Sequence, residues 1–535
     1  MAIGSEDYLL AEFRDRQEDI AGPSKAFLVG AGPGNPGLMT LRGAEVLSVA
    51  DVVLYDRLVA DSLLDLCHPS AERICVQSLE GTHPQRWPEI CRILVKKSKL
   101  HRVVVRLKGG DPFLFGRGAE ECEALLAANI PYEVVPGVSS GLGAPAWAGI
   151  PVTHRDISSS VAFVTAHELG SQETRMDWQA IAAFPGTLVF FMPLLQIQNL
   201  RTRLLDHGMD PAIPAALIER GTLPDQRVVV TTLDRLVESA TGLTSPTLIV
   251  VGPVVSYRDK IGWSEKRPLA GMRILLTRPE HQAAATIATF TRLGALVENQ
   301  PLIGIGPSPN PEAFHQSLTH LSEYAWVVFS SINSVRAFFN ALKALGKDSR
   351  ALGSCRIACI GPSTANCLAE YGIKADLVPQ EFSSEGIVSE LETSCSGQKI
   401  LLIRADRGRD ILTQKLAKVA IVHQVKAYSH QDLPTLTQKR IDELENGKWN
   451  WVVLGSSTIA HQWAKLTKDL PQIPLPKVAT ISPITAAAAI QSGLKPEAIA
   501  KEFTFNGTSM VLDILGLISA GVVFFLGFDA SRDLV

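Results

Sequence analysis

The chain of 535 residues is long enough for several domains, because a single hydrophobic core stops growing at roughly 250–300 residues. Its 51 basic and 54 acidic residues nearly balance, which excludes the strong basic excess of a nucleic-acid binder. Hydrophobic residues make up 46% of the chain, as in soluble globular proteins. The eight cysteines are scattered without a CxxC pair, so we expect reduced thiols, a cytoplasmic location and no metal site.

The N-terminal part begins with a polar, charged stretch, residues 1–24, which we expect to be a flexible extension and not a signal peptide. An apolar strand then leads into the loop 31–37 (AGPGNPG). This loop formally satisfies GxGxxG, and Asp56 follows about 20 residues later, as a nicotinamide-binding fold requires. However, Pro33 and Pro36 remove two of the backbone N–H donors that would hold a pyrophosphate, which argues against an oxidoreductase.

A glycine-rich loop follows a later strand. The apolar run Val103–Val105 leads into residues 106–118 (RLKGGDPFLFGRG), and a helical pattern begins at Ala119. A strand, a glycine-rich loop and a helix in this order place a ligand at the carboxyl end of a parallel sheet. Gly109 and Gly110 would let the backbone approach that ligand closely.

This segment resembles the signature of the uroporphyrinogen-III C-methyltransferases of the tetrapyrrole methylase family. Other segments continue the resemblance in order along the first half of the chain. They are residues 27–37 (FLVGAGPGNPG), 50–59 (ADVVLYDRLV), 135–140 (VPGVSS), 148–156 (AGIPVTHRD), 188–192 (LVFFM), 219–222 (ERGT) and 248–252 (LIVVG). The resemblance implies two α/β subdomains with a cofactor cleft between them.

The resemblance also implies that the first half uses S-adenosylmethionine as its methyl donor. The residues that match the cofactor contacts of the family are Pro33, Gly109, Gly110, Asp111, Leu114, Ser139, Ser140, Met192 and Gly221. The tetrapyrrole substrate carries eight carboxylates, so its pocket should be cationic. The candidate substrate-binding residues are Arg57, Arg117, Arg155 and Arg220.

Two residues are predicted to act in methyl transfer. Asp56 ends a strand at the ligand-facing edge, and the family uses the matching aspartate as a proton acceptor or as a partner of a pyrrole N–H. A carboxylate there would stabilise the positive charge that C-methylation builds on the ring. Arg106 would orient substrate carboxylates or assist deprotonation.

Ser78 departs from the family pattern. The family has a lysine at this position, thought to act as a proton donor, and serine can neither carry a charge nor act as a comparable acid. Three consequences stay open: the lysine is dispensable, this chain methylates slowly, or it methylates a different tetrapyrrole.

The second half begins at a boundary predicted within residues 258–272, where a polar connector precedes a new strand. Short β-branched runs then alternate with helical patterns, which indicates parallel α/β architecture. The runs are residues 326–329, 356–360, 399–403, 451–454 and 477–481. A weak internal repeat relates 326–334 (WVVFSSINS) to 451–458 (WVVLGSST). Two similar lobes with facing turns imply a cleft between them.

This half is similar to the uroporphyrinogen-III synthases, a two-lobed α/β fold. The matching segments are residues 275–280 (LLTRPE), 328–331 (VFSS), 360–365 (IGPSTA), 426–428 (KAY) and 482–486 (SPITA). In that family the chain crosses to the second lobe and returns, so we expect one lobe from 272–306 plus 434–515 and the other from 307–433. The predicted organisation is a methyltransferase-like domain at 25–265, a linker at 266–271, a synthase-like domain at 272–515 and an apolar tail at 516–535.

The resemblance implies that the second half closes hydroxymethylbilane to uroporphyrinogen III with inversion of ring D. The reaction needs no nucleophile or cofactor. The protein must instead hold the linear chain so that the correct closure is faster than the spontaneous, incorrect one. Tyr428 is predicted to assist departure of the hydroxyl group, with a structural role at the end of a strand as the alternative. Ser330, Thr364 and Thr485 are expected to bind carboxylates.

The whole chain is therefore predicted to be bifunctional, closing the linear tetrapyrrole and methylating the product twice to precorrin-2, for sirohaem or cobalamin synthesis. The alternative is a methylase for another tetrapyrrole fused to a non-catalytic tetrapyrrole-binding module. The methyltransferase half is expected to form a homodimer. The apolar run 514–528 is shorter than the about 20 residues of a bilayer span, so we expect a docked helix and leave contact with a membrane open.

Overall fold

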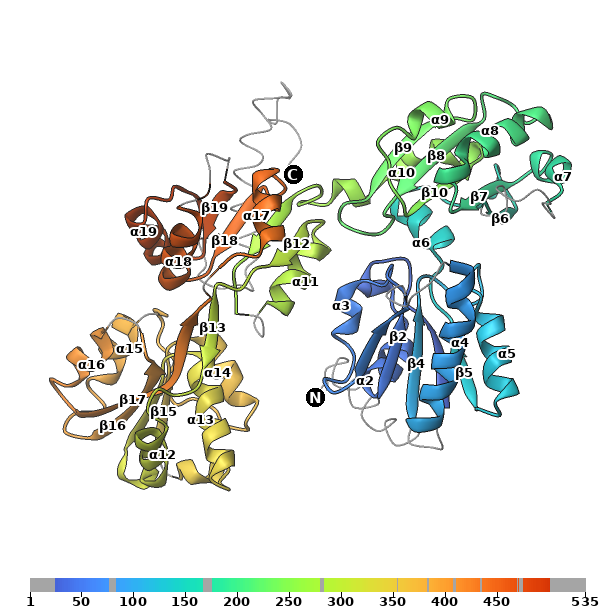
Figure 1. The fold of residues 1–535 in the computed structure, drawn as a ribbon. Coiled ribbons are helices and arrows are strands. Elements are labelled where there is room, and N and C mark those ends of the chain that lie inside the picture. The colour runs from blue at the N-terminus through green and yellow to red at the C-terminus, as the bar shows by residue number, and fades with distance from the viewer. Residues whose placement is uncertain are drawn as a thin grey trace. The chain divides into compact units, whose positions relative to one another are not determined.

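The computed structural model describes residues 25–76, 83–166, 176–279, 283–353, 355–382, 384–407, 410–433, 435–468, 470 and 475–500. The predicted extension 1–24, Ser78 and the apolar tail lie outside these ranges. The chain divides into two compact units, one made of the residues up to Met272 with Thr291–Leu296, and the other of the remainder. Figure 1 colours the chain from blue at the N-terminus to red at the C-terminus. Within the described ranges, no helix is long and apolar enough to cross a membrane.

The first sheet of the N-terminal unit is built from apolar strands that are parallel throughout, in the order β3-β2-β4-β1-β5. Its strands are β1 (Lys25–Gly30), β2 (Val52–Tyr55), β3 (Glu72–Cys75), β4 (Val103–Lys108) and β5 (Tyr132–Val135). Its helices are α2 (Leu41–Ser48), α3 (Asp61–Leu64), α4 (His83–Leu100) and α5 (Gly118–Ala127). Helices α2 and α3 cover one face and α4 and α5 the other (Figure 1), and a separate apolar cluster fills each interface. The parallel arrangement brings the carboxyl ends of all these strands to one edge.

The second sheet of this unit has the order β6-β7-β10-β8-β9, with β6 parallel to β7 and the other pairs antiparallel. Its strands are β6 (Val161–Thr165), β7 (Thr187–Phe191), β8 (Pro214–Glu219), β9 (Arg227–Thr232) and β10 (Thr247–Val251). The helices that follow these strands and pack on one face are α7 (Trp178–Ala182), α8 (Ile197–Asp206) and α9 (Leu236–Ser239); α10 (Arg258–Ile261) ends the domain. Helix α6 (Ser140–Trp147) leaves β5 of the first sheet and packs Ala144 on the other face of the second sheet. The start of α6 is therefore where the two subdomains meet.

The C-terminal unit also contains two sheets. One, in the order β12-β11-β18-β19-β20, consists of β11 (Arg273–Leu276), β12 (Leu296–Asn299), β18 (Trp451–Leu454), β19 (Lys477–Thr480) and β20 (Pro496–Ile499). Its helices are α11 (Ala284–Arg292), α17 (Gln438–Glu445), α18 (Ser457–Thr467) and α19 (Pro483–Gln491). The other, in the order β13-β17-β16-β14-β15, consists of β13 (Ile303–Gly306), β14 (Trp326–Phe329), β15 (Arg356–Cys359), β16 (Lys399–Ala405) and β17 (Ile421–Asp432). Its helices are α12 (Pro311–Thr319), α13 (Ile332–Ala344), α14 (Pro362–Ala369), α15 (Ser384–Leu391) and α16 (Ile411–Leu416).

The internal repeat is confirmed as a repeated strand and helix arrangement. In each lobe the Trp-Val-Val strand leads to a helix whose N-cap is a serine, Ser331 for α13 and Ser456 for α18. The next parallel strand, β15 or β19, leads to a helix that opens with a proline, Pro362 or Pro483. The predicted parallel α/β architecture is therefore confirmed.

The predicted boundary between the lobes differs from the structure at β13. The sequence placed residues 303–306 with the first lobe, but β13 pairs antiparallel with β17 in the sheet of the second lobe. Ile303 nevertheless packs in the apolar cluster of the first lobe, with Leu275 and Trp463. The strand therefore serves both lobes, because β13 and β17 are the two segments by which the chain crosses and returns.

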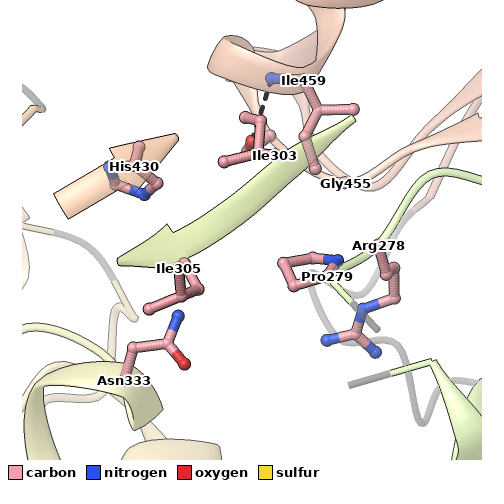
Figure 2. Close-up of a pocket in the computed structure, with 9 residues that line it drawn as sticks. Arg278, Pro279, Ile303, Ile305, Asn333, His430, Gly455 and Ile459 are labelled. Carbon is pink, nitrogen blue, oxygen red and sulfur yellow. Dashed lines mark hydrogen bonds between the residues drawn. The ribbon is translucent and has the colours of Figure 1, made fainter. Parts of the chain in front are cut away.

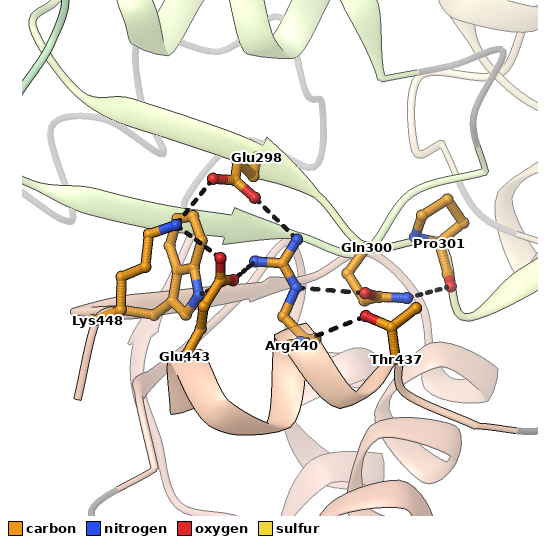
Figure 3. A network of polar contacts seen from close by, with 8 residues as sticks. Glu298, Gln300, Pro301, Thr437, Arg440, Glu443 and Lys448 are labelled. Carbon is orange, nitrogen blue, oxygen red and sulfur yellow. Dashed lines mark hydrogen bonds and ion pairs between the residues drawn. The ribbon is translucent and has the colours of Figure 1, made fainter. Parts of the chain in front are cut away.

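A polar network joins the two separate segments that build the first lobe (Figure 3). Arg440 on α17 contacts Glu298 of β12 at 3.0 Å and Glu443 at 2.6 Å, and Lys448 contacts the same two carboxylates at 3.1 and 2.8 Å. Arg440 also lies 5.0 Å from the ring of Trp449. Burial acts to raise the pKa of Glu443, but Lys448 and Arg440 outweigh it and hold that pKa below its usual range. Its contribution to stability is thus present above the pKa of the unfolded chain and is lost as the pH falls through the folded value.

The predicted linker at 266–271 is packed and not a free connector. Trp263, just before it, lies with its ring centroid 4.9 Å from that of Trp147, and its Nε1 donates to the Ala146 carbonyl at 3.0 Å. Leu269 is fully buried, and its N–H donates to the Leu293 carbonyl. Polar residues separate Trp263 from Leu269, so no apolar pattern in the sequence indicated that this segment packs.

We predict that Arg440→Met destabilises the C-terminal unit by about 2–3 kcal/mol, because Glu298 and Glu443 lose their shared partner while the stem still packs on Trp449. Urea unfolding of the full chain measures this. The control, Arg350→Met, removes an exposed ion pair with Asp348 and is expected to leave unfolding unchanged. Equal effects of the two substitutions would contradict a role for the network in joining the lobe.

Candidate active sites

The carboxyl ends of β1, β4 and β5 approach one another closely, without room for side chains. A Cβ added to Gly137 would lie 2.2 Å from the Gly110 carbonyl oxygen and 2.7 Å from Cα of Gly30. Gly110 has a φ of +69° and exchanges two backbone hydrogen bonds with Gly32, at 2.8 and 3.2 Å. The edge of the first sheet is therefore bare backbone that a ligand can approach.

Asp111 fixes the glycine loop at this edge. Its Oδ1 accepts the N–H groups of Phe113 and Leu114 at 2.9 and 3.2 Å, and its Oδ2 accepts the Gly137 N–H at 3.1 Å. The sequence predicted that Asp111 contacts a cofactor. The structure places it at that edge with both oxygens bonded to backbone, so it shapes the loop.

Helix α6 packs between a loop of each subdomain. A Cβ added to Gly143 would lie 2.7 Å from Cγ of Pro33. A Cβ added to Gly221 would lie 2.2 Å from Cβ of Ala144. Ser139 caps the helix by accepting the Gly141 N–H at 3.2 Å. The loops at Pro33 and Gly221 are thereby held at adjacent positions of α6.

Aromatic and apolar side chains continue the site across the second subdomain. The rings of Phe115 and Phe191 lie 5.0 Å apart, and Leu114 packs on the apolar cluster that contains Phe191 and Ala144. Met192 directly follows Phe191 and is 54% exposed. The loops that carry the predicted cofactor residues therefore contact one another. These residues are Pro33, Gly109, Gly110, Asp111, Leu114, Ser139, Ser140, Met192 and Gly221.

Backbone strain is concentrated on the same loops. Among the described residues of the N-terminal unit, six non-glycine residues have a φ between +51° and +70°. Five of them lie on these loops: Phe115, Arg117, Met192, Arg220 and Thr222. The sixth is Asn129. Each such residue costs roughly 1–3 kcal/mol and persists where the surroundings impose it, commonly at functional sites. No sequence pattern indicated this strain, because none of these residue types favours a positive φ.

A buried group of four charges stands beside this edge. Arg106 contacts Asp56 at 2.5 Å and Glu121 at 2.8 Å, and Lys108 contacts Glu121 at 2.9 Å. Glu121 is fully buried, Arg106 and Lys108 are 2% exposed, and the Asp56 side chain is 23% exposed. Burial lowers the pKa of Lys108, whereas the two carboxylates outweigh burial and raise the pKa of Arg106. Asp56 is thus the member of the group that reaches the surface of the site.

This arrangement corrects one prediction. Arg106 was expected to orient substrate carboxylates or assist deprotonation, but its guanidinium is sealed between the sheet and α5. Its Nη1 also donates to the Leu107 carbonyl at 3.1 Å. Asp56 additionally accepts the Gly109 N–H at 3.4 Å. The side chain of Arg106 is only 3% exposed, and its ion pair holds Asp56 beside the glycine loop.

The arginines predicted to bind substrate are mostly exposed. Arg57 and Arg155 are exposed, and Arg117 lies 5.2 Å over the ring of Trp87 with its side chain 48% exposed. Arg220 pairs with Asp225 at 2.7 Å. Arg117 also pairs with Glu120 at 3.9 Å, so Arg117 and Arg220 both have an anionic neighbour, and the binding of substrate carboxylates by these arginines stays a prediction.

The C-terminal unit contains a cavity of about 190 Å³ lined by both of its lobes (Figure 2). The first lobe contributes Arg278, which follows β11, and Ser456, the N-cap of α18. The second contributes Asn333 on α13 and His430 on β17, and Ile305 of β13 adds an apolar wall. The cleft predicted from the repeat is confirmed, because Asn333 and Ser456 stand at the N-terminal ends of equivalent helices.

Arg278 is the cation of this cavity. It donates to Thr286 Oγ1 at 3.0 Å, and burial lowers its pKa to about 10, so it stays charged at neutral pH. A partly buried guanidinium is a strong receptor for a carboxylate. The sequence had matched its motif but not singled it out, although a charged residue directly after a strand was a usable signal.

Tyr428 lies beside the cavity and is 5% exposed. Its hydroxyl is 3.0 Å from Ser331 Oγ, and burial raises its pKa. The register between β16 and β17 shifts between Arg404 and Ala405, and Ala405 then pairs with Tyr428. Such a β-bulge changes the direction of nearby side chains and is common next to active sites. The near-complete burial of Tyr428 fits the structural alternative, and its predicted role in departure of the hydroxyl group stays a prediction.

The predicted hydroxyl groups are less accessible than expected. Ser330 donates to the Ile403 carbonyl at 3.0 Å. Thr364 and Thr485 are 4% and 3% exposed in the first turns of α14 and α19, and Thr485 Oγ1 is 3.0 Å from Ser482 Oγ. Their side chains support the turns, and the exposed neighbours Ser363 and Ile484 form the surface there. The sequence missed Asn333, although it stands in the repeat segment 326–334, and His430, which no motif indicated.

Comparison with known proteins matches both units to families. The model of the tetrapyrrole (corrin/porphyrin) methylases matches residues 25–237, and that of uroporphyrinogen-III synthase HemD matches residues 284–509. Porphyrin biosynthesis protein HemD of Ruminiclostridium josui is 36% identical over 472 residues, which cover 88% of this chain and 94% of that protein. Siroheme synthase 2 of Cronobacter sakazakii is 46% identical over 46% of this chain and 53% of that protein. A uroporphyrin-III C-methyl transferase structure from Thermus thermophilus, complexed with S-adenyl homocysteine, is 39% identical over 43% of this chain and 93% of that one, with a TM-score of 0.38.

The two family models, the Ruminiclostridium josui relative and the two sites define a protein of tetrapyrrole biosynthesis with two α/β units. The chain belongs to the family in which a tetrapyrrole methylase is fused to a uroporphyrinogen-III synthase, like the Ruminiclostridium josui protein. It matches about half the length of the siroheme synthases. The predicted fusion and the predicted fold class are confirmed.

We predict that Gly137→Ala destabilises the N-terminal unit by roughly 1–3 kcal/mol, because the new methyl group overlaps the backbone of Gly110 and Gly30. Gly109→Ala is the matched control, since its nearest neighbour would be Leu58 Cβ at 3.8 Å. Thermal unfolding of both variants measures the difference. A loss of stability in Gly109→Ala as large as in Gly137→Ala would contradict the close approach.

Proposed function

We propose that the C-terminal half closes hydroxymethylbilane to uroporphyrinogen III with ring D inverted, and that the N-terminal half methylates this product twice, to precorrin-2. The observation that carries the proposal is the match of both families, in order, within a chain that covers 94% of a relative of the same organisation. The product of the one reaction is the substrate of the other, which gives the fusion a chemical reason.

The N-terminal site fits S-adenosylmethionine as methyl donor. Bare backbone at Gly109 and Gly110, apolar walls from Pro33 and Leu114, and the exposed Met192 suit a ligand with a polar amino acid end and a flat adenine. The cofactor supplies a methyl group that its sulfonium already makes electrophilic. The protein is left mainly with positioning the acceptor carbon and excluding water.

Asp56 is placed where its negative charge can act on the methylated pyrrole ring. Methylation of a pyrrole carbon makes the ring positive, and a carboxylate beside it stabilises that charge and accepts the proton. Arg106, itself held by Glu121, keeps Asp56 at the glycine loop. The exposed Arg57, Arg117 and Arg155 are the side chains we assign to substrate carboxylates.

The cavity of the C-terminal unit suits a folded, multiply anionic chain. Arg278 offers a partly buried cation, and Asn333 and Ser456 offer polar groups from both lobes. A substrate held between two lobes can be bent so that its ends meet, which supports closure with rearrangement over the spontaneous reaction.

Asp56→Asn is expected to lower kcat for methyl transfer about 10²–10⁴-fold, because the amide can neither accept a proton nor balance the positive ring. Binding of S-adenosylhomocysteine, measured by calorimetry, should stay within a few-fold of the parent. Asp61→Asn, an exposed position at the start of α3, is the control. Unchanged transfer by Asp56→Asn would remove this carboxylate from the mechanism.

The assignment of substrate is tested by anaerobic incubation with uroporphyrinogen III and labelled S-adenosylmethionine, counting methyl groups on the tetrapyrrole. Two methyl groups per macrocycle support the proposal and show that a lysine at position 78 is dispensable. Ser78 favours one second candidate, methylation of another tetrapyrrole. Cofactor binding without transfer to uroporphyrinogen III would support that candidate.

A further inference from the structure

We infer that His430, oriented by Asp406, is the acid that protonates the departing hydroxyl group of hydroxymethylbilane. The inference rests on the proposed synthase function of the C-terminal unit. It gives to His430 the step that the sequence had assigned to Tyr428.

The ring of His430 is fixed on one side and open on the other. It projects from β17 and lines the cavity between the lobes (Figure 2). Its Nδ1 is 3.1 Å from Asp406 Oδ1, and the same oxygen accepts the His430 backbone N–H at 2.9 Å. Its Nε2 makes no hydrogen bond to any residue within the described ranges, so this nitrogen is free to meet a ligand in the cavity.

Among the described residues, Asp406 is the anionic group that contacts the ring of His430. Burial acts to raise the pKa of Asp406, but the bonds from His430 and the charge of Arg407 outweigh it and lower that pKa. A carboxylate that bonds one nitrogen of an imidazole orients the ring and leaves the other nitrogen available for proton transfer. The other charged or titratable groups near the ring are Arg407, which pairs with Asp432, Tyr428 on the same strand, and Arg278 on the cavity wall. The helices that reach the cavity from the two lobes contribute Asn333 and Ser456, which are neutral.

Tyr428 is poorly placed to be the acid. Its hydroxyl is engaged with Ser331, its side chain is almost fully buried, and burial raises its pKa. Its ring stands edge-on to His430 with centroids 5.4 Å apart. Tyr428 therefore supports the position of His430.

The step balances without any further reactant. The proton on Nε2 of the imidazolium passes to the hydroxyl oxygen, the C–O bond of the hydroxymethyl group breaks, and water leaves. The positive charge moves to the pyrrole system, whose electron pair stabilises the methylene carbon that ring D then attacks. After closure the macrocycle loses one proton, which returns to the imidazole and restores the acid.

The test compares His430→Gln with His423→Gln in the full chain. His423 lies on the same strand, is exposed and pairs with Tyr324 away from the cavity. Uroporphyrinogen III formed from hydroxymethylbilane is measured against pH, after oxidation to porphyrins and separation of the type I and type III isomers. We expect His430→Gln to lower kcat about 10²–10³-fold with KM nearly unchanged, and to abolish the fall in kcat at alkaline pH. His423→Gln should match the parent.

A second variant keeps the test informative if His430→Gln folds poorly. Asp406→Asn retains a side-chain acceptor for His430 but removes the negative charge, so the alkaline fall in kcat should move to lower pH. A loss confined to KM in His430→Gln would make His430 a carboxylate anchor and overturn the inference, as would an unmoved pH profile in both variants. Failure of the parent to form type III product above the enzyme-free control would overturn the proposed function as well.

Discussion

Parallel pairing of β1, β2, β4 and β5 brings four strand ends to one edge of the first sheet, and the site of the N-terminal unit depends on how closely the backbone approaches there. Gly30, Gly110 and Gly137 leave no space for a single Cβ between them. Asp111 then fastens the loop of β4 to that of β5, and α6 carries the edge across to the second sheet. The strained loops at Met192 and Arg220 complete the site from that side.

In the C-terminal unit, the ends of parallel strands also build the site, once in each lobe. In both lobes a Trp-Val-Val strand ends in a serine that caps the next helix, so polar groups gather where parallel strands end. Two such ends line one cavity, and β13 with β17 runs between the lobes to form part of its wall. A reaction that needs a linear molecule to be bent is well served by two similar half-sites.

Buried charge has different roles in the two units. In the N-terminal unit, Glu121 and Lys108 stabilise the position of Arg106, which orients Asp56 at the site. In the C-terminal unit, Arg440 and Lys448 join α17 and the segment after it to β12, which lies more than 140 residues earlier in the chain. The first group prepares chemistry, whereas the second maintains a lobe built from two pieces of chain.

The sequence predicted most of the strands, the repeat and the fold class, because β-branched runs and capping serines carry local signals. The glycine loops were also recognisable, since Gly110 adopts a φ of +69° and Gly137 leaves no room for a Cβ. The partners of Arg106 could not be predicted, because Glu121 stands on a helix whose pattern indicates only an amphipathic surface. Nor could His430 be found: its role depends on Asp406, which lies 24 residues away and meets it only when β16 and β17 pair.

The most direct test of the account is a single reaction in which the full chain receives hydroxymethylbilane and labelled S-adenosylmethionine under anaerobic conditions. Mass spectrometry and isomer analysis then identify the tetrapyrrole formed. The account predicts a type III macrocycle carrying two labelled methyl groups, produced by one protein from the linear precursor. Unmethylated type I product at the rate of the enzyme-free control would contradict it.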